Sequence, residues 1–121
     1  MGLDMYLFKE KENGENEEVF YWRKAYPIMD FFEAELNGVF NCRYHIVDRV
    51  ILTELLYFCD SFINEGFSAL DYYGWHWTDE YEKQEWYDYH MEWVIKTKLF
   101  LEKLLPSGDL DKYCYKFYAW W

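Results

Sequence analysis

The side chains that most often bind metals or act in catalysis are few in this chain and widely spaced. Its histidines are His45, His76 and His90. His76 could share one helical face with Glu80, and Asp79 is next to Glu80 in the sequence. A zinc site needs three or four ligands in tight geometry, and the spacing supplies no third ligand. We therefore expect no metal site.

The three cysteines, Cys42, Cys59 and Cys114, form no C-x-x-C pair. A cysteine nucleophile needs a base beside it, and Cys42 is close in sequence to His45. Cys59 falls on the apolar face of a predicted helix, where thiols are usually inert packing groups. The odd number of cysteines, with no apolar leader in residues 1–10, favours free thiols in a reducing cytoplasm.

Motifs for phosphate binding and hydrolysis are missing as well. The sequence contains no glycine-rich phosphate loop, no G-x-S-x-G and no H-E-x-x-H. Carboxylate pairs such as Glu82 and Glu85 occur, but 23 acidic residues make some pairing unavoidable. We therefore expect no cofactor, and a protein that contacts a partner rather than an enzyme. One alternative is a small-ligand-binding protein or enzyme with a pocket between the sheet and the third helix predicted below.

Composition narrows the class of partner. A chain of 121 residues fits one domain, and a hydrophobic fraction of 52% is enough for a core. The net charge of −11 repels the phosphates of nucleic acids and anionic lipids. No apolar stretch approaches the roughly 18 residues of a membrane span. We expect a protein partner with a basic surface, no direct nucleic-acid contact and no membrane insertion. Alternatively, the acidity only keeps an aromatic-rich chain in solution.

The elements that must position any site begin with a predicted β-hairpin. Residues 3–9 and 19–24 have the composition of strands, and Asn13-Gly14 between them favours a two-residue type I′ turn. The numbers of any two residues that face each other across the hairpin then add up to 27. This register pairs Asp4 with Arg23 and Lys9 with Glu18, which are opposite in charge, and Phe8 with Val19. It places Leu3, Met5, Leu7, Phe20 and Trp22 on the core face, and Asp4, Tyr6, Phe8, Val19, Tyr21 and Arg23 on the other.

Three helices and a last strand follow. The first helix has Pro27 at its first position and stops at Asn37-Gly38, and residues 39–46 are irregular or briefly extended. Asp48 caps the second helix, which Gly66 ends. The third helix runs from about Asp79 to Leu105, and its first turns either break away near Lys83 or project. Residues 112–121 alternate as a strand. The predicted fold is α+β, with a three-stranded antiparallel sheet in the order β-β-α-α-α-β packed against three helices.

One stretch stands apart because rings and acids alternate along it. Residues 72–92 contain six acids against one base, interleaved with eight Tyr and Trp side chains. Aromatic anchors with an acidic rim suit the binding of a basic protein, because Tyr and Trp dominate binding hot spots and charge steers encounter. The alternatives are that the rings pack under the loop, or that exposed rings pair two copies in a homo-oligomer. The predicted partner contacts are Tyr72, Tyr73, Trp75, Trp77, Asp79, Glu80, Glu82, Glu85 and Trp86.

Two stretches near the start of the chain resemble known proteins. Residues 1–7 read MGLDMYL and residues 21–25 read YWRKA. With Ile28 and Phe32, they resemble a family of small uncharacterised phage and prophage proteins. The resemblance implies a viral setting, in which small acidic proteins often bind and disable host factors. It implies a protein of the host cytoplasm that inhibits a basic or nucleic-acid-handling host protein, for example as a DNA mimic.

Overall fold

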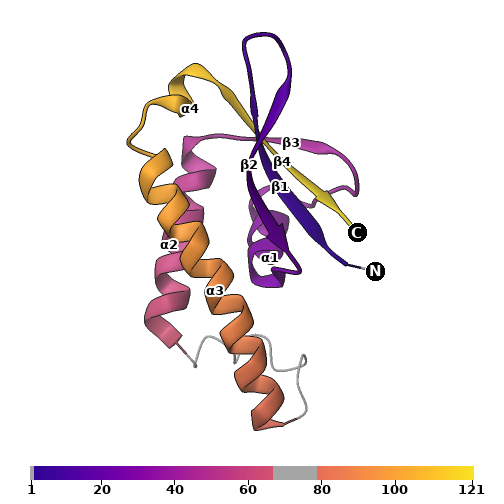
Figure 1. The fold of residues 1–121 in the computed structure, drawn as a ribbon, viewed down its shortest axis with the longest axis vertical. Helices are drawn as coiled ribbons and strands as arrows, with labels where there is room; N and C mark the ends of the chain where they lie inside the picture. Colours follow the sequence, from indigo (N-terminus) through magenta and orange to yellow (C-terminus); the bar gives the residue numbers. More distant parts are fainter. Residues whose placement is uncertain (1, 67–78) are drawn as a thin grey trace.

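A computed structural model of the chain describes residues 2–66 and 79–121. Within them, four antiparallel strands form one sheet in the order β2-β1-β4-β3, and the longer helices lie together on one side of it (Figure 1). The strands are β1 (Asp4–Glu10), β2 (Asn16–Arg23), β3 (Tyr44–Val47) and β4 (Cys114–Trp120). The helices are α1 (Tyr26–Glu35), α2 (Arg49–Glu65), α3 (Glu80–Leu104) and α4 (Asp109–Lys112).

The predicted α+β class is confirmed, but a sheet of three strands with three helices is wrong in detail. β3 adds a fourth strand, which begins in the segment predicted to be irregular or briefly extended and pairs with β4. Four residues are too few to show the alternation by which a strand is recognised, so this strand depends on its tertiary pairing. The short helix α4 lies where the sequence predicted only a turn before the last strand. The predicted joining of the last strand to the hairpin is correct, because β4 pairs with β1.

The hairpin register is confirmed near its open end and wrong near its tip. The pairs from Asp4–Arg23 to Leu7–Phe20 sum to 27 as predicted, but Phe8 pairs with Glu18 and Lys9 with Glu17. The cause is a three-residue loop in place of the type I′ turn: the Lys11 N–H donates to Glu15 O (2.7 Å), and Gly14 alone in the loop has a positive φ, of 87°. A β-bulge that leaves Val19 unpaired restores the register, and Val19 packs against the core rather than on the outer face.

Helix ends follow the predicted capping chemistry. The Asp48 carboxylate accepts from the Ile51 N–H at 3.0 Å, and the Asp79 carboxylate accepts from the Glu82 N–H at 2.8 Å. Gly66 ends α2 with a φ of 59°. α3 is continuous past Lys83, so its first turns do not break away; they extend beyond the sheet (Figure 1).

The core lies between the inner face of the sheet and the helices. The inner-face side chains Met5, Leu7, Trp22 and Phe117 are all buried. α1 contributes Phe32, whose ring stacks on Phe117 with centroids 3.9 Å apart. α3 is tied to β2 by one buried polar contact, in which the Trp22 indole N–H donates to Thr97 Oγ1 at 2.8 Å.

Thr97→Val should lower the free energy of unfolding by about 1–3 kcal/mol, because it leaves the buried Trp22 N–H without its acceptor. Urea unfolding followed by Trp fluorescence measures the change. Thr97→Ser keeps the hydroxyl and should cost less than Thr97→Val. Equal losses for the two variants would show that the hydrogen bond is not what anchors α3.

Candidate functional site

The outer face of the sheet carries a cluster of five aromatic rings. Side chains alternate between the two faces of a strand, so the residues between the buried inner positions point away from the helices. Strand pairing brings five of them from four strands side by side. We call this cluster the aromatic platform; its members are Tyr6 and Phe8 of β1, Tyr21 of β2, Tyr44 of β3 and Tyr118 of β4.

The platform rings touch one another in a continuous layer. Tyr6 lies at its centre, with ring centroids 5.2 Å from Tyr21, 5.7 Å from Phe8 and 6.1 Å from Tyr118. Tyr44 closes the far side, 5.0 Å from Tyr118 and 5.6 Å from Phe8. Centroid separations in this range are those of favourable aromatic pairs, so the layer is held in shape before any partner arrives.

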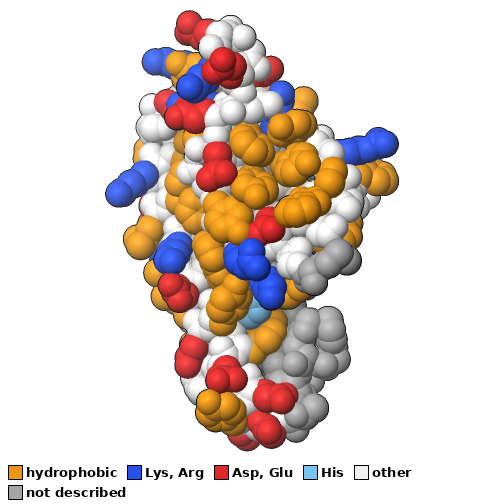
Figure 2. Space-filling model, turned by 45° about the vertical axis from the view of Figure 1, so that its right-hand side comes forward, with side chains coloured by type: hydrophobic (Ala, Val, Ile, Leu, Met, Phe, Trp, Pro, Cys, Tyr) orange, Lys and Arg blue, Asp and Glu red, His pale blue; other side chains and the backbone are white. Residues whose placement is uncertain are grey.

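Part of this layer is open to solvent, because Tyr44 is exposed while the other four rings are half-buried. Tyr44 is 51% exposed, and at the margins Ile46 and Trp120 are 69% and 54% exposed. Figure 2 shows hydrophobic side chains gathered in the upper half of this side of the molecule, and acidic side chains gathered at the lower end, where α3 begins. A contiguous apolar patch rimmed by polar groups is typical of an interaction surface.

Charged groups on the same face pair with each other. Asp4 accepts a hydrogen bond from the Tyr21 hydroxyl and forms an ion pair with Arg23 at 3.3 Å. Lys116 pairs with Glu10 at 3.5 Å, and its ammonium lies 5.6 Å from the Tyr44 ring centroid. The two bases on this face are therefore already partnered by acids, while Glu18, which lies opposite Phe8, adds an exposed acid beside the rings.

The platform phenols are hydroxyl donors rather than phenolates at neutral pH. The hydrogen bond to Asp4 raises the pKa of Tyr21 above its usual value of 10.0. Desolvation raises the pKa of Tyr6, and the hydrogen bond with Cys42 raises the pKa of Tyr118. Each of these three tyrosines therefore presents an apolar ring face together with a neutral O–H, the combination that makes tyrosine frequent in protein interfaces.

The contacts predicted from the sequence lie elsewhere. Tyr72, Tyr73, Trp75 and Trp77 fall outside the described residues. The predicted acids Asp79, Glu80, Glu82 and Glu85 are exposed on the first turns of α3. These turns extend beyond the sheet that carries the platform (Figure 1).

Several acids along α3 have local partners. Asp79 is the helix cap, Asp88 accepts from the Gln84 amide at 2.9 Å, and Glu92 pairs with Lys96 at 3.0 Å. The predicted contact Trp86 packs toward the core, with its ring centroid 4.0 Å from that of His90. The exposed acids thus form a charged surface, and Trp86 contributes to packing beneath it.

The remaining reactive side chains are dispersed. Burial raises the pKa of the Cys59 thiol to about 12, which makes it a poor nucleophile. Cys42 is exposed, but its nearby histidine, His45, accepts a hydrogen bond from the Phe40 N–H through Nε2. No group of three potential metal ligands comes together within residues 2–66 and 79–121.

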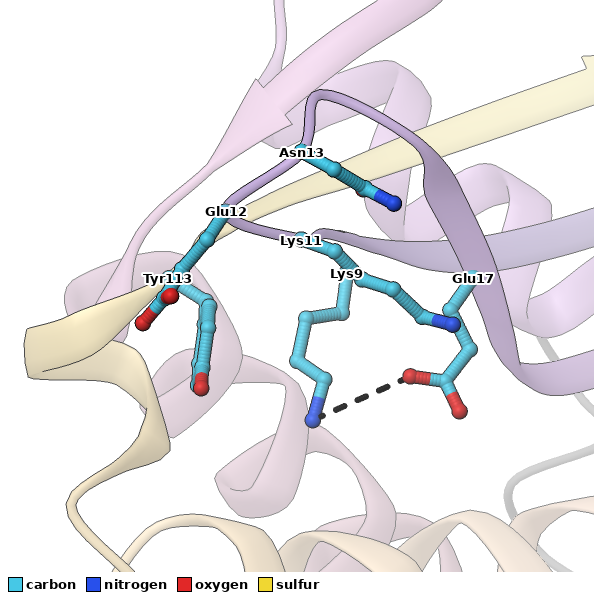
Figure 3. A pocket seen from close by; sticks show the side chains of 6 residues that line it. All are labelled: Lys9, Lys11, Glu12, Asn13, Glu17 and Tyr113. Carbon is cyan, nitrogen blue, oxygen red and sulfur yellow. Dashed lines mark ion pairs between the residues drawn. The ribbon is translucent and has the colours of Figure 1, made fainter.

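A hollow of about 410 Å³ lies between the hairpin tip and Tyr113 (Figure 3). Lys9 faces Glu17 across it, at 3.9 Å, and pairs with Asp109 at 3.2 Å. Its ammonium also lies 4.8 Å from the Tyr113 ring centroid. Because two carboxylates already neutralise Lys9, it is not available to bind an anion.

The alternative pocket between the sheet and α3 corresponds to a hollow of about 310 Å³, whose lining includes Val19 and Phe100. Its polar groups bond to one another. The Tyr115 hydroxyl and the Lys9 ammonium both donate to Asp109 Oδ2 at 3.2 Å. Convergent polar groups are thus present, but they are satisfied within the chain.

No helix in the described part of the chain is long and apolar enough to cross a membrane. No protein-family model, curated protein or solved structure matches the chain. The functional argument therefore depends on the residues alone.

Sequence reasoning missed the platform because its rings are distant in the chain and become neighbours only through strand pairing. Part of the platform could be recognised in the sequence. The predicted outer face of the hairpin already contained Tyr6, Phe8 and Tyr21, and the last strand was predicted to alternate Tyr118 against Phe117. The missing fact was that no described helix covers that face.

Asp4→Asn should lower the pKa of Tyr21 toward its usual value, because the hydrogen bond to the Asp4 carboxylate is the largest cause of the rise. An NMR titration of ring-labelled tyrosines measures this. A raised folded-state pKa stabilises the fold below about pH 10, and this stability is lost as the pH rises through the folded value. Wild type should therefore lose this contribution in alkali, and Asp4→Asn should lack it. An unchanged Tyr21 titration, matching that of the distant control Asp111→Asn, would contradict the assignment.

Proposed function

We propose that the chain is a non-enzymatic protein-binding module whose contact surface is the aromatic platform. The observation that carries the proposal is the layer of five touching rings on a sheet face that no described helix covers. Apolar area left in water costs about 25 cal/mol per Å², so a partner that covers the layer gains binding energy. The mutual ring contacts limit the entropy that binding must remove from these side chains.

We propose further that the partner presents a basic surface. The net charge of −11 attracts cationic proteins over a distance and repels nucleic acids. The same charge on a second copy of the chain opposes self-association, particularly at low salt. On the platform face Arg23 and Lys116 are paired with acids, and Glu18 adds a further acid beside the rings. In this proposal the acids speed encounter and the rings supply most of the affinity.

The rings also suit the side chains of such a partner. The ammonium groups of Lys116, Lys96 and Lys9 each lie near a ring within this chain, 4.8–5.6 Å from the centroids of Tyr44, Trp93 and Tyr113. An arginine or lysine from a partner would meet the platform rings in the same way, at about 0.5–2 kcal/mol per contact. If the resemblance to phage and prophage proteins holds, the partner is a host protein that this module inhibits.

Photo-cross-linking at matched positions tests the proposal. A photoreactive phenylalanine derivative at position 44, on the platform, should trap a basic protein from a lysate, with a yield that falls as salt rises. The same group at position 57 is the control, because Tyr57 is a comparably exposed tyrosine (59%) on α2. Equal trapping at both positions would contradict the platform. Cross-links between two copies that strengthen with salt would favour a homo-oligomer instead.

Binding measurements with the trapped protein should then separate rings from charge. Tyr118→Ala should weaken binding by about 2 kcal/mol, as for a hot-spot residue, mainly through faster dissociation. A double charge reversal of Glu80 and Glu85 should mainly slow association. Tyr57→Ala should leave both rates unchanged. If Tyr118→Ala behaves like Tyr57→Ala, the platform is not the contact surface.

A further inference from the structure

A hollow of about 460 Å³ beside α1 has a lining that no part of the proposed function uses. None of its residues belongs to the platform. It is lined by Gly2, Leu3, Tyr26, Met29, Glu33 and Trp121.

The hollow has one aromatic wall that is fixed in place. Asn41 holds the Trp121 backbone through two hydrogen bonds, donating from Nδ2 to the carbonyl (3.1 Å) and accepting from the N–H at Oδ1 (3.0 Å). Tyr26 supplies a second ring at the start of α1, and the buried Met29 supplies apolar contact on the same helix. Two aromatic side chains and a thioether thus border one space.

The one charged side chain among the residues that line the hollow is an acid, Glu33. Glu33 is half-buried, and its Oε2 accepts from the Val39 N–H at 3.2 Å. Across the described residues, no Lys, Arg or His approaches Glu33 to ion-pair distance. Desolvation and the nearby charge of Glu33 both raise the pKa of Asp30, which precedes Glu33 by about one turn of α1.

The nearest bases do not neutralise this charge. Arg23 and Lys24 pass beside Gly2 at one end of the hollow. Arg23 is paired with Asp4 on the outer face of the sheet. Lys24 forms no ion pair with Glu33, so the carboxylate has no cationic partner within residues 2–66 and 79–121.

We propose that this hollow binds an alkylammonium group, either on a small free cation or on a methylated lysine side chain. A methylated ammonium is apolar at its surface and carries a diffuse positive charge. It can therefore contact the faces of Tyr26 and Trp121, as quaternary ammonium groups do in aromatic cages, while Glu33 balances the charge. A neutral group of the same shape would gain the apolar contact but leave the carboxylate unpartnered.

Calorimetric titration of the intact chain with choline, and separately with its uncharged isostere 3,3-dimethylbutan-1-ol, tests the role of charge. Choline should bind, and the isostere should bind at least roughly tenfold more weakly, the discrimination that a desolvated cation–π contact supports. A capped trimethyl-lysine amide is the second ligand. If it binds more tightly than choline, the ammonium comes from a protein side chain; the reverse order identifies a free cation.

Variants locate the site. Trp121→Ala and Glu33→Gln should each weaken choline binding by roughly 3- to 30-fold. The glutamine variant retains an oxygen for the Val39 N–H, and Tyr57→Ala should have no effect. In wild-type protein, the Trp121 indole NMR signal should shift on titration, which tests the site even if a variant fails to fold. Equal binding of choline and its isostere, or no binding of choline at millimolar concentration, would overturn the proposal.

Discussion

The feature that determines the rest of the structure is that the described helices cover only one face of the four-stranded sheet. Alternation forces half of each strand's side chains away from the helices, whatever the sequence places there. The inner half is fixed by Trp22, which donates its buried N–H to Thr97 of α3, and by the stacking of Phe32 of α1 on Phe117. With α1 and α3 held against that face, the rings of the opposite half remain at the surface. The platform is therefore a consequence of how the helices dock.

Charge and aromatic surface are separated on the molecule, and this separation suits two different tasks. The exposed acids of α3 lie at one end, while the bases of the platform are paired with Asp4 and Glu10. Long-range attraction needs only net charge, which sets the rate of encounter. Affinity comes from rings that lose their contact with water on binding. Burying an unpaired charge beside them would be costly, because the charge would lose its hydration. An aromatic centre whose bases are already paired, on a molecule with a large net negative charge, meets both requirements.

Local chemistry in the sequence was enough to predict much of the fold. Asp48, Asp79 and Gly66 were recognised as helix ends because capping depends on one residue and its immediate neighbours. The predicted hairpin register was correct near the open end, from the pair Asp4–Arg23 to the pair Leu7–Phe20. It was wrong near the tip because the loop formed by residues 12–14 has one residue more than an Asn-Gly turn, and a bulge at Val19 absorbs the difference. β3 and the platform could not be predicted locally, since both arise from pairing between segments about seventy residues apart or more.

The central claim is that a basic partner meets the outer face of the sheet and not the acidic end of α3. The most direct measurement is an NMR titration of the isotope-labelled chain with an arginine-rich peptide, observing aromatic and carboxyl side chains at low and high salt. The account predicts that the ring signals of Tyr6, Tyr44 and Tyr118 shift together at low salt, and that Tyr44 and Tyr118 still shift when salt screens the acids. Shifts confined to Glu80, Glu82 and Glu85, with unchanged platform rings, would contradict it.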